Sequence, residues 1–161
     1  MPICGALLAL RVEIMSFFTT DRENLKTLLG DIDCGRLQLP DFQRNWKWDD
    51  ERVQDILASV SQHYPVGAIM MLETGGELTF ATEPVAGAPK LPPHPPSRLI
   101  LDGQQRLTAL YQALMGQKPV DTIDSRGRPV QRIYYIDMNA ALEASNDPSK
   151  AIISVRPDGC L

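Results

Sequence analysis

The chain has 161 residues, with 16 Lys and Arg against 20 Asp and Glu, which gives a formal net charge of −4. This length suits one domain, and a content of 43% hydrophobic and 22% charged residues excludes a disordered chain and a fibrous protein. No apolar stretch reaches the roughly 18 residues that cross a bilayer, and an acidic protein does not bind DNA through net charge alone. Three widely spaced cysteines and two histidines indicate reduced thiols in the cytoplasm and no zinc site.

The two ends of the chain carry little sign of domain structure. Residues 1–15 include an apolar stretch that is too short for a membrane span and lacks the positively charged start of a secretory signal. We therefore predict a non-domain extension over 1–15 and one domain over 16–161. Because the sequence ends shortly after an expected strand, we also expect it to be the N-terminal fragment of a longer architecture.

Two helices and a short strand are predicted in the first part of the domain. Thr20 and Glu23 have the spacing of a capping box, and the leucines that follow predict a helix over 21–29. An extended segment at 37–40 ends at a proline. A second helix is predicted over 49–63, because aspartates precede apolar residues that recur at helical spacing.

The middle of the chain predicts a hairpin and then an irregular loop. The apolar run 66–72 is typical of a buried strand, and Gly75 and Gly76 would turn it into a second strand at 78–81. Residues 84–97 are dense in proline and small residues, so we expect an exposed loop without a packed core. His94 lies in this loop and is interpreted as a solvated side chain.

The last elements alternate between strands and one helix. A strand at 98–101 leads directly into a third helix, which Gly116 ends, and two more strands are expected at 133–138 and 151–155. The whole pattern predicts an α+β fold.

The junction Asp102-Gly103-Gln104-Gln105-Arg106, between a strand and a helix, is the strongest functional signal. The first turn of a helix presents unpaired N–H groups at the positive end of the helix dipole, and a glycine there lets the backbone approach a phosphate closely. Arg106 is disfavoured in that turn by about a few tenths of a kcal/mol, because its charge faces the positive end of the helix dipole. A bound anion would make the electrostatic environment of Arg106 favourable. Gln104 and Gln105 add neutral donors and acceptors.

Two residues of this junction have alternative interpretations. Asp102 either caps the helix or holds a Mg²⁺ ion that accompanies a nucleotide. Arg106 either binds an anion or forms a salt bridge to Asp102 or Asp41. A strand–glycine–helix junction is common in α/β turns, so the junction alone does not decide between them.

A second polar group lies among aromatic residues upstream. We predict that Gln43 and Arg44 bind a ligand, because planar polar groups between aromatic rings need partners. Phe42 and Trp48 are interpreted as core or interface anchors.

Three motifs in this order carry a resemblance to a known family. They are Leu39-Pro40-Asp41-Phe42-Gln43-Arg44 with Trp48, then Tyr64-Pro65-Val66-Gly67, then Leu101-Asp102-Gly103-Gln104-Gln105-Arg106-Leu107-Thr108. Together they resemble the N-terminal domain of the GmrSD-type restriction endonucleases, which belongs to the wider ParB/sulfiredoxin-like fold. The resemblance covers roughly residues 17–138.

The resemblance implies a small mixed sheet with flanking helices that binds, and in many relatives hydrolyses, a nucleotide. In longer relatives this domain drives an HNH-type nuclease that attacks modified or foreign DNA. Sulfiredoxins carry a cysteine where this chain has Gln104, so the resemblance does not extend to their redox reaction. Two histidines cannot build an HNH metal site, so a nuclease would have to be a separate chain.

We therefore expect a nucleoside triphosphate with Mg²⁺ to bind at Gly103–Arg106, with Arg44 and Arg106 neutralising its charge and Asp102 as the candidate for catalysis. This would serve a modification-dependent DNA restriction or phage-defence system. Two alternatives remain open: a non-enzymatic module that senses DNA or docks a partner through the mildly basic segment 98–132, and an inactive truncated remnant.

Overall fold

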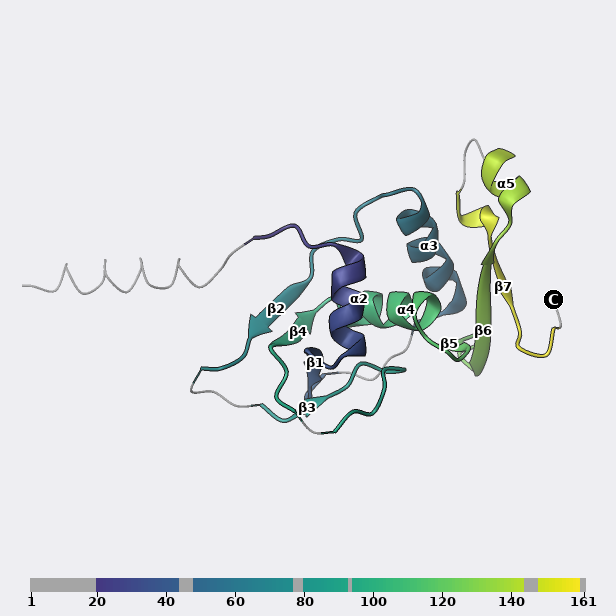
Figure 1. The fold of residues 1–161 in the computed structure, drawn as a ribbon. Coiled ribbons are helices and arrows are strands. Elements are labelled where there is room, and N and C mark those ends of the chain that lie inside the picture. Colours follow the sequence, from purple (N-terminus) through teal and green to yellow (C-terminus); the bar gives the residue numbers. More distant parts are fainter. Residues whose placement is uncertain (1–19, 44–47, 77–79, 93, 144–147, 160–161) are drawn as a thin grey trace, which may run out of the picture.

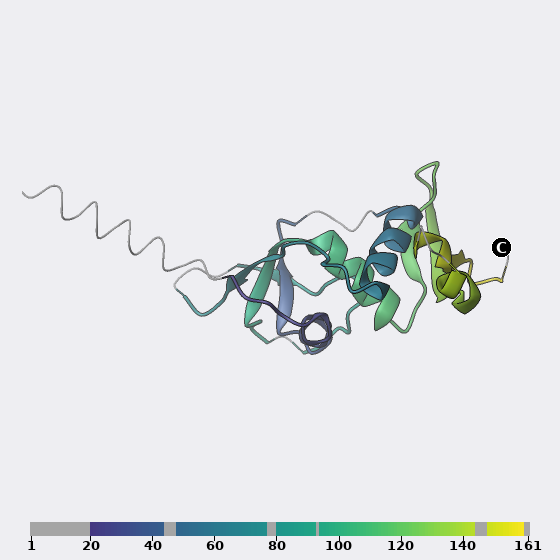
Figure 2. The same cartoon turned by 90° about the horizontal axis from the view of Figure 1, so that it is seen from above.

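The computed structural model describes residues 20–43, 48–76, 80–92, 94–143 and 148–159. In these ranges two β-sheets stand at opposite ends of a central group of helices, as the two perpendicular views show (Figure 1, Figure 2). The central helices are α2 (Leu25–Asp33), α3 (Asp50–Ser61) and α4 (Gln104–Leu114), while α5 (Met138–Glu143) and the 3-10 turn η1 (Pro148–Ala151) lie beside the second sheet. The fold is thus α+β, as predicted.

The first sheet is mixed and has the strand order β2-β4-β1-β3. Its strands are β1 (Leu37–Pro40), β2 (Met70–Glu73), β3 (Thr82–Glu83) and β4 (Arg98–Asp102). The two central strands, β1 and β4, are parallel, with Leu37 opposite Arg98 and Gln38 opposite Leu99. Because the strands are parallel, the segments that follow both of them leave the sheet at the same edge.

The second sheet is antiparallel and has the order β5-β6-β7. It is formed by β5 (Val120–Ile123), β6 (Pro129–Ile136) and β7 (Ile152–Val155). Helix α3 packs against β7 and η1, and α4 contacts β5, so the two helices connect the second sheet to the rest of the fold.

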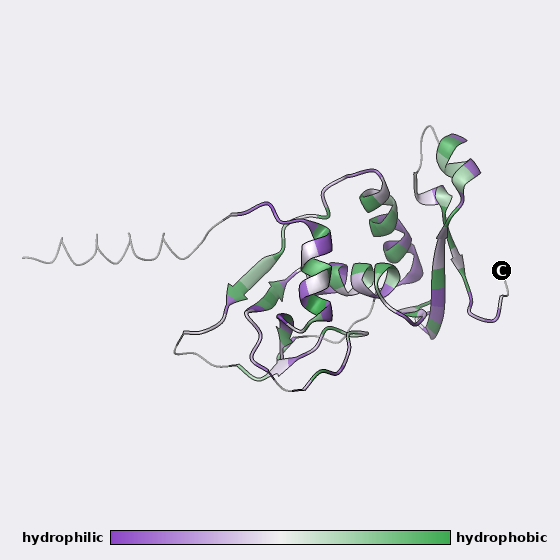
Figure 3. Ribbon diagram, in the orientation of Figure 1, coloured by the Kyte–Doolittle hydropathy of each residue, from purple (hydrophilic) through white to green (hydrophobic). Residues whose placement is uncertain are grey.

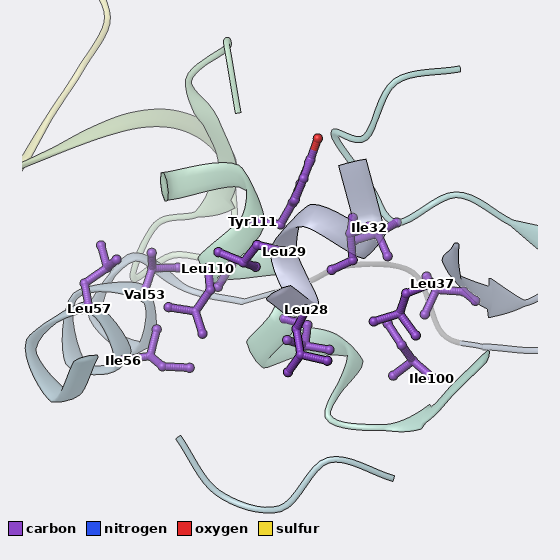
Figure 4. Close-up of a cluster of buried hydrophobic side chains, with 14 of the residues drawn as sticks. Leu28, Leu29, Ile32, Leu37, Val53, Ile56, Leu57, Ile100, Leu110 and Tyr111 are labelled. Atoms are coloured by element: carbon purple, nitrogen blue, oxygen red, sulfur yellow. The ribbon is translucent and has the colours of Figure 1, made fainter. Parts of the chain in front are cut away.

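The hydrophobic core lies between α2, α3, α4 and the first sheet. Figure 4 shows its labelled side chains converging from these elements, and Figure 3 shows the hydrophobic stretches along them. On α3, Val53, Ile56 and Leu57 are buried at the spacing predicted from the sequence. On α4, Leu107 and Leu110 are fully buried. This core fixes the position of α3 and α4 relative to the parallel strands.

The start of the first helix differs from the prediction. Helix α2 begins at Leu25 and ends at Asp33, and its N-cap is Asn24, whose side chain accepts a hydrogen bond of 2.9 Å from the backbone N–H of Lys26. The capping box at Thr20 and Glu23 is therefore wrong. Glu23 instead forms a 2.7 Å ion pair with Arg98 on β4. The prediction of α3 was correct, and Asp49 caps it.

The predicted hairpin is also wrong. The strand in this region is β2, at Met70–Glu73, which is largely exposed and pairs with β4 at the edge of the sheet. Residues 77–79 lie outside the described part, and β3 pairs with β1 instead of β2. The apolar run starts before the strand because its first residues form a loop whose carbonyl groups have other partners, described below.

The remaining elements differ from the prediction in several places. Helix α5 and the turn η1 were not predicted, and the strand expected at 133–138 ends at Ile136. No helix or strand occurs at the described positions within 84–97, but Val85 in this loop is 1% exposed and belongs to the core. Strand β6 begins at Pro129, earlier than predicted. Strand β5 was missed, although the buried Val120 and Thr122 alternate with exposed or half-buried neighbours. The predicted extension at 1–15 lies outside the described residues.

Candidate functional site

The two polar groups predicted from the sequence meet at one edge of the first sheet. Gln43 follows β1, and its side-chain amide donates a 3.1 Å hydrogen bond to the carbonyl of Leu101, near the end of β4. The parallel pairing of β1 and β4 explains this contact between residues that are 58 positions apart. Arg44 lies outside the described residues.

Gly103 makes the turn between β4 and α4. It is the N-cap of α4 with a φ of +90°, and the helix has no side-chain hydrogen bond at this cap. A Cβ on residue 103 would lie 3.0 Å from Cγ1 of Ile69. The turn therefore requires glycine for its backbone angle and its tight packing, and this glycine N-cap has no side chain to bond the first N–H groups of α4.

Asp102 does not cap the helix, so that interpretation is wrong. It is the last residue of β4, and its side chain is 73% exposed. Gln104 is buried and Gln105 is half-buried in the first turn of α4. The exposed carboxylate thus lies beside the first helical turn without closing it.

Arg106 reaches from α4 to the loop before β2. Its Nη1 donates to the carbonyl of Val66 at 2.9 Å, and its Nη2 donates to the carbonyl of Ala68 at 2.7 Å. A third contact, from Nη2 to Oδ2 of Asp102, is longer at 3.4 Å. The predicted salt bridge is present, but the two carbonyl groups are the closer partners.

The loop at 66–68 is shaped around this guanidinium. Gly67, between the two acceptor residues, has a φ of +92°, and a Cβ there would overlap Nη1 of Arg106. Among the described residues, Nε and the second N–H of Nη1 of Arg106 have no hydrogen-bond acceptor. Arg106 is therefore held in place and keeps two donors for another partner.

Sequence reasoning missed the role of the 66–68 loop. Gly67 is part of the Tyr64-Pro65-Val66-Gly67 motif, but backbone carbonyl groups leave no trace in a sequence. The glycine at position 67 was the one signal of this loop in the sequence, because glycine tolerates a positive φ and the close approach of another group to its backbone.

The aromatic residues around Gln43 separate into two kinds. Trp48 packs against the hydrophobic core, as interpreted from the sequence. Phe42 is 63% exposed and stands edge-to-face against Phe80, with the ring centroids 6.1 Å apart. Phe42 is thus a surface residue, which excludes the core position for it and leaves the interface anchor as a prediction.

Most of the cations in segment 98–132 are neutralised within the fold. Arg98 pairs with Glu23 at 2.7 Å and with Asp31 at 2.6 Å. Ion pairs also join Arg128 to Asp124 at 2.7 Å and Arg132 to Asp50 at 3.2 Å. Within the described ranges, Lys118 and Arg126 are the cations of this segment without an ion partner. Segment 98–132 therefore offers little unneutralised positive charge to a DNA backbone.

The fold and the site together define an α+β domain with a strand–glycine–helix turn and an arginine held beside it. The family model described as "GmrSD restriction endonuclease, N-terminal domain" matches residues 25–155, so the chain belongs to this family, as the motifs indicated. The family associates the chain with DNA restriction systems.

The chain is also similar to part of a longer protein. The chain is 31% identical over 143 residues to the uncharacterized protein MJ0686 of Methanocaldococcus jannaschii. That match covers 86% of this chain and 24% of the relative, so the chain spans about a quarter of the relative's length. No solved structure matches the chain. In the described part, no helix has the length and hydrophobicity needed to cross a membrane.

Proposed function

We propose that this domain binds a nucleoside triphosphate with Mg²⁺ at the turn between β4 and α4, and that the bound nucleotide controls a GmrSD-like DNA restriction system. The observation that carries the proposal is the position of Arg106. It is fixed by two backbone carbonyl groups beside a helix start whose N-cap is Gly103.

A phosphate group fits this arrangement on three grounds. The dipole and the N–H groups of the first turn of α4 attract an anion. Arg106 keeps two N–H donors directed to no acceptor in the described protein. Gln43 stands at the same sheet edge, and Arg44 follows it in the sequence as a second charge. The carboxyl ends of parallel strands are a usual place for ligands in open sheets.

Asp102 is our candidate ligand for the Mg²⁺ ion. Nucleotide-bound Mg²⁺ uses one or two protein carboxylates together with phosphate oxygens and water, so an exposed carboxylate next to the turn fits it. Among the residues that the structure describes, no group of three or more His, Cys, Asp or Glu could hold a metal by itself. If the domain hydrolyses the nucleotide, Asp102 would also place the ion against the phosphates.

The partners follow from the family and stay proposals. DNA and a separate HNH-type nuclease chain are the partners that the resemblance implies. The alternative of a DNA-sensing module without nucleotide gains no support from segment 98–132, because Arg98, Arg128 and Arg132 already have carboxylate partners.

The phosphate assignment is tested by adding a negative charge at the turn. Replacing Gln105→Glu puts a carboxylate in the first turn of α4, which favours the helix by about 0.3–1 kcal/mol but repels phosphate. Thr27→Glu adds the same charge to the first turn of α2, an exposed position away from the site, and is the matched control.

Binding of ATP, GTP, CTP and UTP with Mg²⁺ is measured by calorimetry, and stability by thermal unfolding. We expect Gln105→Glu to lose nucleotide affinity while its melting temperature holds or rises, and Thr27→Glu to bind as the wild type does. Unchanged affinity in Gln105→Glu, or no nucleotide binding by the wild type, would refute the proposal.

A further inference from the structure

An open pocket lies beside Arg106, on the side of helix α3. Its volume is about 260 Å³, and Arg106 forms part of its wall. The residues of α3 that line it, Arg52, Asp55, Ile56 and Ser59, recur at helical spacing on one face of the helix. The pocket thus shares a wall with the proposed phosphate site.

The inner lining of the pocket is apolar and partly aromatic. Trp48, Ile56, Pro65 and Val66 contribute to it. Ile56 belongs to the core, Trp48 packs against the core, and the carbonyl of Val66 is held by Arg106. Ile56, Trp48 and Val66 are therefore in place before any ligand arrives, which lowers the ordering cost of binding.

The rim of the pocket on α3 is polar. Asp55 is exposed and has no ion partner among the described residues, and Arg52 is 65% exposed with Asp49 at 3.3 Å. Ser59 donates from Oγ to the carbonyl of Asp55 at 2.9 Å. The rim thus offers a carboxylate acceptor, guanidinium donors and a hydroxyl within one helix face.

An apolar floor with a polar rim matches a nucleobase, which has two apolar faces and a polar edge. The volume also suits a single ring system, because pockets for whole drug-sized ligands hold roughly 300–1,000 Å³. A triphosphate alone would gain nothing from the apolar floor.

We infer that this pocket receives the base of the nucleotide whose phosphates bind at the start of α4, with Arg106 standing between the two. The inference rests on the proposed function and adds to it a place for the base. It makes a distinction that can be measured: a nucleoside triphosphate uses both sites, whereas inorganic tripolyphosphate uses the phosphate site alone.

Two serines of α3 provide a matched pair of variants. Ser59 lines the pocket, while Ser61 is exposed at the end of the helix and does not line it. Both hydroxyl groups donate back to a helix carbonyl, Ser59 to Asp55 and Ser61 to Ala58. Ser59→Leu fills the pocket, and Ser61→Leu makes the same chemical change outside it.

Calorimetry compares each nucleoside triphosphate with tripolyphosphate, all with Mg²⁺. We expect the wild type and Ser61→Leu to bind at least one nucleotide more tightly than tripolyphosphate, by roughly 5- to 150-fold if the base stacks in the pocket. Ser59→Leu should bind that nucleotide no better than tripolyphosphate, and tripolyphosphate as the wild type does.

Four results would overturn the inference, and they differ in what they say of the proposed function. Equal affinity of the wild type for nucleotides and tripolyphosphate, or a preserved preference in Ser59→Leu, leaves phosphate binding intact but removes the base pocket. Loss of tripolyphosphate binding in Ser59→Leu would place phosphates in the pocket instead. Binding of neither ligand by the wild type refutes the proposed function and this inference together.

Fluorescence gives a second measurement if Ser59→Leu does not fold. In a Trp46→Phe background, Trp48 is the sole tryptophan of the chain. The nucleotide should change the emission of Trp48, whereas tripolyphosphate should not. The same change with both ligands contradicts a base beside Trp48.

Discussion

Gly67 leaves the space that the guanidinium of Arg106 occupies. The glycine has a φ of +92°, and any Cβ at this position would overlap Nη1 of Arg106. The carbonyl groups on either side, of Val66 and Ala68, are the acceptors of that guanidinium. The position of the arginine therefore depends on the absence of a side chain 39 positions earlier in the sequence.

We predict that Gly67→Ala destabilises the protein more than Gly75→Ala does. Gly75 has a φ of +107°, and a Cβ on it would meet no atom within 4 Å, so alanine there suffers the backbone strain alone, about 1–2 kcal/mol. At Gly67 the same strain adds to the loss of at least one hydrogen bond of Arg106. Urea unfolding measures the difference, and calorimetry should show weaker nucleotide binding for Gly67→Ala only. Equal destabilisation of both variants would mean that the guanidinium moves aside without cost.

We predict that Arg106→Lys lowers the free energy of unfolding by about 1.5–3 kcal/mol, because a single ammonium group cannot reach both carbonyl groups in the way the planar fork does. Arg106 is 25% exposed on its side chain, so little of this effect is relieved by water. Arg52→Lys, on a side chain that is 65% exposed, is the control and should stay within about 0.5 kcal/mol of the wild type. If the two variants are equally stable, Arg106 does not hold the loop.

The local features of the fold could be predicted from the sequence, because their signals lie within a few residues of one another. Asp49 followed by apolar residues at helical spacing predicted α3, and Gly103 marked the turn into α4. The run 66–72 could not be assigned in the same way. A continuous apolar run has no alternation to fix a strand or its partner, and part of it forms the loop around Arg106.

The candidate site was predicted as two separate pieces and could not be assembled from the sequence. Gln43 and the 102–106 turn meet because β1 and β4 are parallel neighbours, which is a property of the whole sheet. The partners of Arg106 are backbone atoms, 38 and 40 positions away, that any residue could supply. The anion that we expected Arg106 to need is partly replaced by these carbonyl groups.

Asp50 connects α3 to the second sheet, and we predict that Tyr134→Phe weakens this connection. The hydroxyl of Tyr134 donates to Oδ1 of Asp50 at 2.8 Å, and Ser154 donates to the same carboxylate at 2.7 Å. Burial, together with the hydrogen bond to Asp50, raises the pKa of Tyr134 and keeps its donor proton in place. Removing a hydrogen bond to a charged group costs about 1.5–3 kcal/mol.

The neighbouring Tyr135 is the control for this change. It is 56% exposed, and its hydroxyl has no hydrogen-bond partner among the described residues, so Tyr135→Phe should alter stability by less than about 0.5 kcal/mol. Urea unfolding of both variants gives the comparison. A loss in Tyr134→Phe no greater than in Tyr135→Phe would show that the carboxylate of Asp50 does not need this donor.

The turn between β5 and β6 gives a prediction for acid conditions. The backbone N–H and the guanidinium of Arg128, with the backbone N–H of Arg126, lower the pKa of Asp124 to about 2. An aspartate in the unfolded chain has a pKa of about 3.9. The stabilisation by Asp124 is therefore present above that pH and disappears as the pH falls toward 2. An NMR titration of the carboxyl carbon should therefore have its midpoint near 2.

Arg128→Gln should raise the midpoint, because it removes the guanidinium. Arg126→Gln should leave it in place, because Arg126 acts through its backbone. A midpoint in Arg128→Gln equal to that of the wild type would assign the low pKa to the backbone of the turn alone.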